Sequence, residues 1–111
     1  LCECIQLTRE DIKREGIIAP LVGHVGDGNF HLTIPYDKKD KQEVDRIEQL
    51  NKRLIERALS MEGTSTGEHG IGLGKKRYMA QEHGPALDLM RMIKKSLDPH
   101  NILNPDKVID L

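Results

Sequence analysis

The chain has 111 residues, 17 basic and 18 acidic side chains, and a formal net charge of −1. This length suits a single domain, and the balanced charge with only 3% aromatic residues argues against a nucleic-acid-binding surface. The longest apolar run, from Ile17 to Val22, is interrupted by Pro20 and is far shorter than the roughly 18 residues that span a bilayer.

The predicted elements of the first part are a helix followed by two extended segments. Apolar residues at helical spacing and a glycine stop predict a helix over residues 1–15 that ends at Gly16. Its two cysteines, Cys2 and Cys4, would point about 200° apart, so we expect neither a disulfide nor a shared metal between them. β-Branched residues predict a buried strand over 17–22, and a second extended segment over 30–36.

The remaining elements are mostly helical. An amphipathic stripe predicts a long helix over 41–61, and a glycine-rich loop without periodicity follows over 64–74. Another helix starts near Pro85, with a stripe of apolar residues at Ala86, Met90, Ile93 and Leu97, before a turn-rich tail. Helices combined with a few strands predict the α+β class. The start within a helix is typical of a piece of a longer protein.

The segment over residues 23–31, GHVGDGNFH, is the first candidate for chemistry. If Asp27 and Gly28 form a two-residue hairpin turn, His24 and His31 become direct cross-strand partners with Cβ atoms about 5 Å apart. Two imidazoles so placed can bind one divalent metal. The same residues also fit a hairpin whose histidines only pack or form hydrogen bonds.

The adjacent Glu68 and His69 are the second candidate, because no helical or strand period explains them. A carboxylate added to two histidines gives a ligand set with open coordination positions, which is typical of catalytic metal sites. His69 would then be free for proton transfer. An exposed loop with a chance Glu-His pair is the alternative. The basic run Lys75–Arg77 is expected to begin a helix or pair with acids, with anion binding as the alternative.

Three sequence blocks together resemble one known family. These are the 23–31 segment, TGEHGIG at 66–72, and the two motifs LDP at 97–99 and LNP at 103–105. In order and spacing they are similar to the C-terminal domain of FAD-linked oxidases in the vanillyl-alcohol oxidase superfamily. The nearest branches are D-lactate dehydrogenase, other D-2-hydroxy-acid dehydrogenases and the glycolate oxidase flavin subunit. The resemblance implies a ferredoxin-like α+β substrate domain, of which residues 1–111 form the second half and tail, without the FAD-binding domain.

The resemblance also implies roles for individual residues. His24, His31 and Glu68 match the ligands of a divalent metal, zinc or manganese. His69 matches the histidine that contacts the substrate and acts as general base.

Three further positions are implied by the same resemblance. Thr33 stands where some relatives have a substrate-contacting asparagine, and this difference favours a lactate-like or other small acid over hydroxyglutarate. Asn104 and Lys107 lie where the family's C-terminus approaches the flavin, so they are candidates for cofactor binding.

The implied function is oxidation of a D-2-hydroxy acid such as D-lactate or glycolate to the 2-oxo acid, with FAD held mainly by an upstream domain. The isolated 111 residues are expected to be inactive. A cytochrome, a quinone or an electron-transfer flavoprotein would accept the electrons, and a homo-oligomer is a further expectation. A cytoplasmic location is expected, with a membrane-peripheral or mitochondrial one as the alternative. The rival interpretation is a stand-alone metal- or small-ligand-binding module without redox activity.

Overall fold

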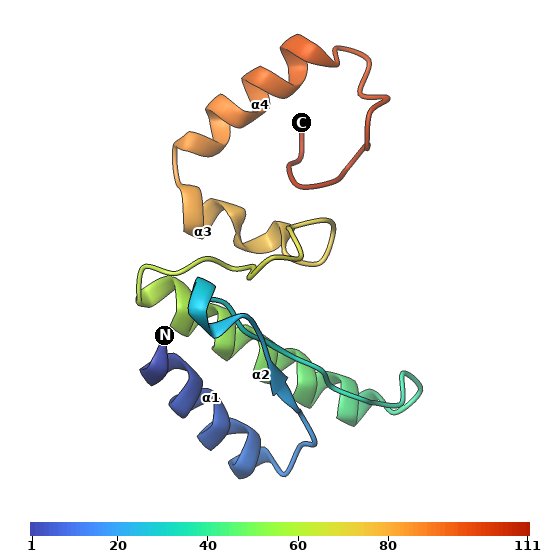
Figure 1. Cartoon of the computed structure of the whole chain (residues 1–111). Helices are drawn as coiled ribbons and strands as arrows, with labels where there is room; N and C mark the ends of the chain where they lie inside the picture. Colours follow the sequence, from blue (N-terminus) through green and yellow to red (C-terminus); the bar gives the residue numbers. More distant parts are fainter. The chain divides into compact units, whose positions relative to one another are not determined.

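The computed structural model describes residues 1–111, which fall into two compact units, residues 1–68 and 69–111. Figure 1 shows the helices and the small sheet in chain order. The first unit contains α1 (Cys2–Glu15), β1 (Leu21–Val22), η1 (Val25–Asp27), β2 (His31–Leu32) and α2 (Lys41–Ser60). The second contains η2 (Lys76–Tyr78), α3 (Met79–His83) and α4 (Ala86–Leu97). Helices with a small sheet confirm the α+β class. None of these helices has both the length and the apolar character needed to cross a bilayer.

The two helices of the first unit begin and end where local chemistry predicts. At the end of α1, Gly16 adopts a left-handed conformation with φ 63°, and its N–H bonds to the carbonyls of Ile12 and Lys13. At the start of α2, the Asp40 side chain accepts hydrogen bonds from the N–H groups of Gln42 and Glu43. These caps confirm the helices predicted over 1–15 and 41–61.

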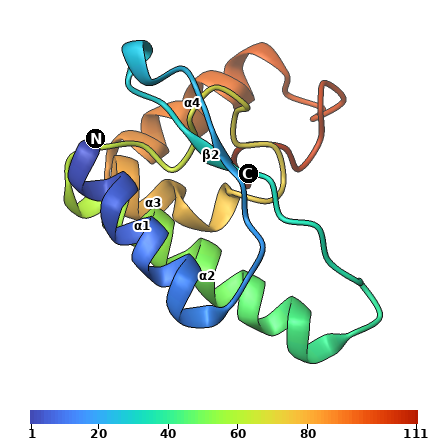
Figure 2. The same cartoon turned by 60° about the horizontal axis from the view of Figure 1, so that its bottom comes forward.

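Charged side chains join α1 to α2. Arg53 contacts Glu15 at 2.7 Å, while Arg57, further along α2, bonds to Asp11 and to the hydroxyl of Thr8 at 3.1 Å. Because the later residue of α2 meets the earlier residues of α1, the two helices are antiparallel, and they lie side by side in both views (Figures 1 and 2).

Asp11 is the centre of this network and is only 3% exposed. Burial by itself raises the pKa of the Asp11 carboxyl. The hydrogen bond from Arg57 and the charges of Arg57, Arg14 and Arg53 outweigh burial, so the pKa lies below its ordinary value of 3.8. The ionised carboxylate therefore stabilises the contact between the helices.

The sheet corrects two predictions. It has two short antiparallel strands, in which Leu21 pairs with Leu32 and Val22 with His31. The predicted pairing of His24 with His31 is therefore wrong, because a 3₁₀ turn at η1 replaces the two-residue turn. The expected buried strand over 17–22 is also wrong in part: only its last two residues pair, and the side chain of Ile18 is 75% exposed.

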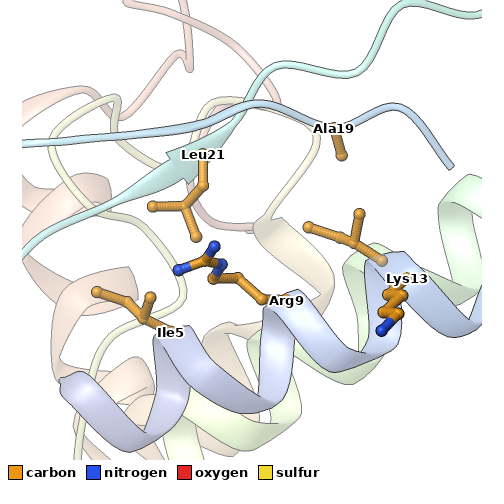
Figure 3. Close-up of a pocket in the computed structure, with 6 residues that line it drawn as sticks. Ile5, Arg9, Lys13, Ala19 and Leu21 are labelled. Atoms are coloured by element: carbon orange, nitrogen blue, oxygen red, sulfur yellow. The ribbon is translucent and has the colours of Figure 1, made fainter.

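A hollow of about 360 Å³ lies between α1 and the segment that leads into β1 (Figure 3). Four apolar and two basic side chains line it: Ile5, Ile12, Ala19, Leu21, Arg9 and Lys13. The Arg9 side chain extends toward Leu21 (Figure 3). None of the candidate site residues lines this hollow.

The second unit differs from prediction in its helices. α4 begins directly after Pro85, as expected, and η2 and α3 begin at the basic run that was expected to start a helix, although their extent was not predicted. The buried position of α4 is Leu87, whereas Ile93 and Leu97 of the predicted stripe are 52% and 77% exposed. The apolar stripe thus predicted the helix correctly, but it is not the face that α4 buries.

The tail after α4 is irregular, as predicted, and polar contacts hold it at both ends. The buried Asp98 carboxylate accepts hydrogen bonds from Lys94 and from the N–H groups of Ile102 and Leu103. The bond from Lys94 is the main reason that the pKa of Asp98 lies below 3.8, and it outweighs the opposing effect of burial. Near the chain end, Lys76 bonds to Asp110, which supports the expectation that this basic run pairs with acids.

Candidate metal centre

His24 lies at the start of the loop that joins β1 to β2. Its carbonyl accepts hydrogen bonds from the N–H groups of Asp27 at 2.9 Å and Asn29 at 3.3 Å. In return, the Asn29 side-chain oxygen accepts the N–H of His24 at 3.0 Å. Gly28, with φ 81°, supplies the left-handed conformation that ends η1. The loop is thus closed by bonds between its two ends.

Gly23 lets the two sides of this loop approach closely. A Cβ atom at Gly23 would lie 2.4 Å from Cα of Phe30 and 2.5 Å from the carbonyl oxygen of Asn29. No side chain fits at such distances from backbone atoms, so this position requires glycine.

His31 occupies a different environment from His24. It lies on β2, opposite Val22, and is half-buried with its Nδ1 atom inside the structure. By contrast, the side chain of His24 is 65% exposed. The strand therefore fixes His31, whereas the loop fixes His24.

Glu68 lies near both histidines. Its Oε2 atom lies 3.5 Å from Nε2 of His24, and it offers a carboxylate oxygen within 4.8 Å of a ring nitrogen of His31. All three residues belong to the first unit. Glu68 thus lies close to both imidazoles, although they are not cross-strand partners.

The donor set fits a divalent ion such as zinc or manganese. Two ligand atoms that are each about 2.1 Å from a tetrahedral ion lie about 3.4 Å apart. The 3.5 Å between His24 and Glu68 matches this separation, and a ring nitrogen of His31 lies within 4.8 Å of a Glu68 carboxylate oxygen. Two neutral imidazoles and one carboxylate would leave positions open for substrate oxygens.

Four other site residues were predicted: His69, Thr33, Asn104 and Lys107. His69 follows Glu68 directly and is the first residue of the second unit, where it is exposed. Thr33 comes just after β2, and its N–H bonds to the carbonyl of Pro20 at 2.9 Å. Asn104 and Lys107 belong to the tail of the second unit, where both are exposed.

Sequence reasoning missed Asn29, whose side chain holds the backbone of His24. An asparagine directly after a left-handed glycine could have indicated this role, because short amides often bond to nearby backbone groups in turns. The two-residue turn predicted for Asp27 and Gly28 left Asn29 as an ordinary strand residue instead.

Comparison with known proteins gives a consistent match. Residues 1–108 match the family model described as FAD linked oxidases, C-terminal domain. A probable mitochondrial D-lactate dehydrogenase of Danio rerio is 49% identical over 112 aligned positions, covering 100% of this chain and 22% of that protein.

Two further relatives are a second D-lactate dehydrogenase and a glycolate oxidase subunit. The mitochondrial D-lactate dehydrogenase (cytochrome) 1 of Saccharomyces cerevisiae is 48% identical, covering 94% of this chain and 18% of the relative. The glycolate oxidase subunit GlcD of Bacillus subtilis is 42% identical, covering 78% of this chain and 18% of that subunit. The chain therefore spans about a fifth of the length of these relatives.

Proposed function

The chain belongs to the family of FAD-linked oxidase C-terminal domains, and from this premise we propose that it supplies the metal and substrate contacts of an FAD-dependent oxidoreductase. The proposed reaction oxidises a D-2-hydroxy acid, such as D-lactate or glycolate, to its 2-oxo acid. The single observation that carries the proposal is the approach of His24 and His31 to Glu68. This ligand set leaves room on a divalent ion for the two oxygens of a hydroxy acid.

In this mechanism the residues of the chain orient the substrate and accept one proton. When bound, FAD supplies the capacity to accept electrons, and the ion supplies positive charge beside the carboxylate and hydroxyl oxygens. His24, His31 and Glu68 would hold that ion. His69 is the general base, and one of its ring nitrogens takes the hydroxyl proton that must leave when an alcohol becomes a ketone.

The substrate class rests on the relatives and on one position. The Danio rerio and Saccharomyces cerevisiae relatives are named for D-lactate and the Bacillus subtilis relative for glycolate, all of them small 2-hydroxy acids. Thr33, two residues beyond His31, contacts the substrate in our proposal. Its short side chain is compatible with such small acids.

The proposed contacts with the flavin and with the electron acceptor rest on the family resemblance. Asn104 and Lys107 approach the flavin, which an upstream domain of the whole protein holds. A cytochrome, a quinone or an electron-transfer flavoprotein takes the electrons from it. The mitochondrial names of two relatives favour the mitochondrial alternative over the cytoplasmic location. Assembly into a homo-oligomer completes the proposal.

One pair of measurements tests the function. Elemental analysis of the purified intact protein should give about one zinc or manganese ion per chain, and a panel of D-2-hydroxy acids with an artificial electron acceptor should give turnover on small substrates. Turnover in the fully metal-free protein would contradict the role of the metal. Stoichiometric metal without turnover on any acid would favour the non-redox binding module.

A further inference from the structure

We infer that Asn29 is a positioning residue that holds His24 and Glu68 at the spacing a shared metal ion requires. The inference deepens the proposed function and rests on it. The Asn29 amide oxygen is used by the His24 N–H, so we assign Asn29 a positioning role and not that of a ligand. Asn29 acts through position, because its side chain contacts both the segment that carries His24 and the segment that carries Glu68.

The first contact fixes His24. The amide oxygen of Asn29 accepts the His24 N–H at 3.0 Å, and the Asn29 N–H reaches the His24 carbonyl at 3.3 Å. These two bonds close the backbone between the residues into a ring around η1. Without the side-chain bond, an imidazole that is 65% exposed would depend on the short 3₁₀ turn alone for its position.

The second contact fixes the segment that carries Glu68. A Cβ atom at Gly67 would lie 3.3 Å from Cβ and 3.8 Å from Cγ of Asn29. The residue before Glu68 therefore rests directly against the Asn29 side chain. Because one half-buried side chain contacts both segments, a shift of Asn29 changes the distance between His24 and Glu68.

This geometry requires a side chain at position 29 that carries an oxygen acceptor and has the length of asparagine. Leucine has a similar volume and no acceptor, so it fills the space but releases the His24 N–H. Glutamine keeps the amide but places it one methylene further out. Aspartate keeps both the length and the acceptor, so it should preserve the spacing.

The test is a Co²⁺ titration of the metal-free intact protein, followed by the visible absorption of the bound ion. We expect Asn29→Leu and Asn29→Gln to raise the Co²⁺ dissociation constant about 10–100-fold, the range found for residues that orient metal ligands, and to change the absorption spectrum. Asn29→Asp should restore tight binding and the wild-type spectrum. Asn51→Leu, a half-buried asparagine in α2, is the matched control and should leave both unchanged.

Thermal unfolding of each metal-free variant shows whether it is folded. If Asn29→Leu does not fold, Asn29→Gln carries the test, because it keeps a polar side chain. Wild-type affinity and spectrum in folded Asn29→Gln would overturn the positioning role. A wild-type protein that binds no Co²⁺ would overturn the proposed metal centre itself, which separates the two failures.

Discussion

Nε2 of His24 lies 3.5 Å from Oε2 of Glu68, although β2, α2 and a glycine-rich loop separate the two residues in the sequence. The distance suits an ion pair when His24 is protonated, and it equally suits two ligands of one ion.

Replacing a proposed metal ligand should lower the amount of metal that the protein binds. Glu68→Gln removes the carboxylate and His24→Ala removes one imidazole. We therefore expect less than one metal ion per chain after dialysis of either variant. Inductively coupled plasma mass spectrometry measures it. Glu62→Gln and His100→Ala, both at exposed positions, are matched controls, and stoichiometric metal in both ligand variants would contradict the assignment.

Replacing His69 should lower kcat and leave the binding of flavin and metal unchanged. His69→Asn removes a proton acceptor while retaining a polar side chain, and loss of a general base typically costs about 10²–10⁴-fold in rate. We expect kcat on D-lactate to fall within that range while flavin and metal content stay at wild-type levels. An unchanged kcat would assign the proton transfer to another group.

Because of the close approach at Gly23, we expect alanine to destabilise the protein much more at Gly23 than at Gly26 of the same loop. In Gly23→Ala the new methyl group meets backbone atoms at 2.4 and 2.5 Å, so the loop must move. We expect about 1–3 kcal/mol of lost stability from this overpacking, together with weaker metal binding.

Gly26→Ala is the matched control for Gly23→Ala. No atom lies within 4 Å of its added methyl group, so the change should stay within about 0.5 kcal/mol. Urea unfolding measures both variants. Equal stability for the two would show that the loop conformation differs from the one described above.

Asp11 predicts how stability depends on pH. Its folded pKa lies below the unfolded value, which is about 3.9. The ionised carboxylate therefore contributes its full stabilisation above the unfolded pKa and loses it as the pH falls through the folded pKa. Asp11→Asn should cost about 1–3 kcal/mol at pH 7.

The difference between wild type and Asp11→Asn should shrink as the pH falls below about 4. Urea unfolding at pH 7 and pH 3 checks this dependence. Asp45→Asn, at an exposed position of α2, should follow the wild type at both values. A constant difference between wild type and Asp11→Asn would remove Asp11 as the source of the pH dependence.

The helices were predictable because their information is local. Gly16 ends α1 and Asp40 begins α2 through contacts with residues only a few positions away, and apolar spacing supplies the rest. The five residues of α3 are too few for such a period. His24, His31 and Glu68 became candidates because of a turn signal and a loop without periodicity, and the family resemblance added the prediction that they are metal ligands.

The approach of Glu68 to His24 and to His31 was not predictable from spacing. Within the loop, Gly23 approaches Phe30 closely and the Asn29 side chain accepts the His24 N–H, and strand alternation in the sequence indicates neither contact. A two-residue turn at Asp27 is a strong local preference. In the structure the 3₁₀ turn η1 takes the place of that turn, and Glu68 lies near both histidines although they do not pair across the strands.

The carboxylate of Asp98 has a consequence for proteolysis. Because it holds the N–H groups of Ile102 and Leu103, and Lys94 also bonds to the Leu103 carbonyl, the backbone just beyond α4 cannot straighten into the extended form that a protease cleaves. The first vulnerable peptide bonds of the tail therefore lie after Leu103, and acid strong enough to protonate Asp98 would move the cleavage sites back toward the helix.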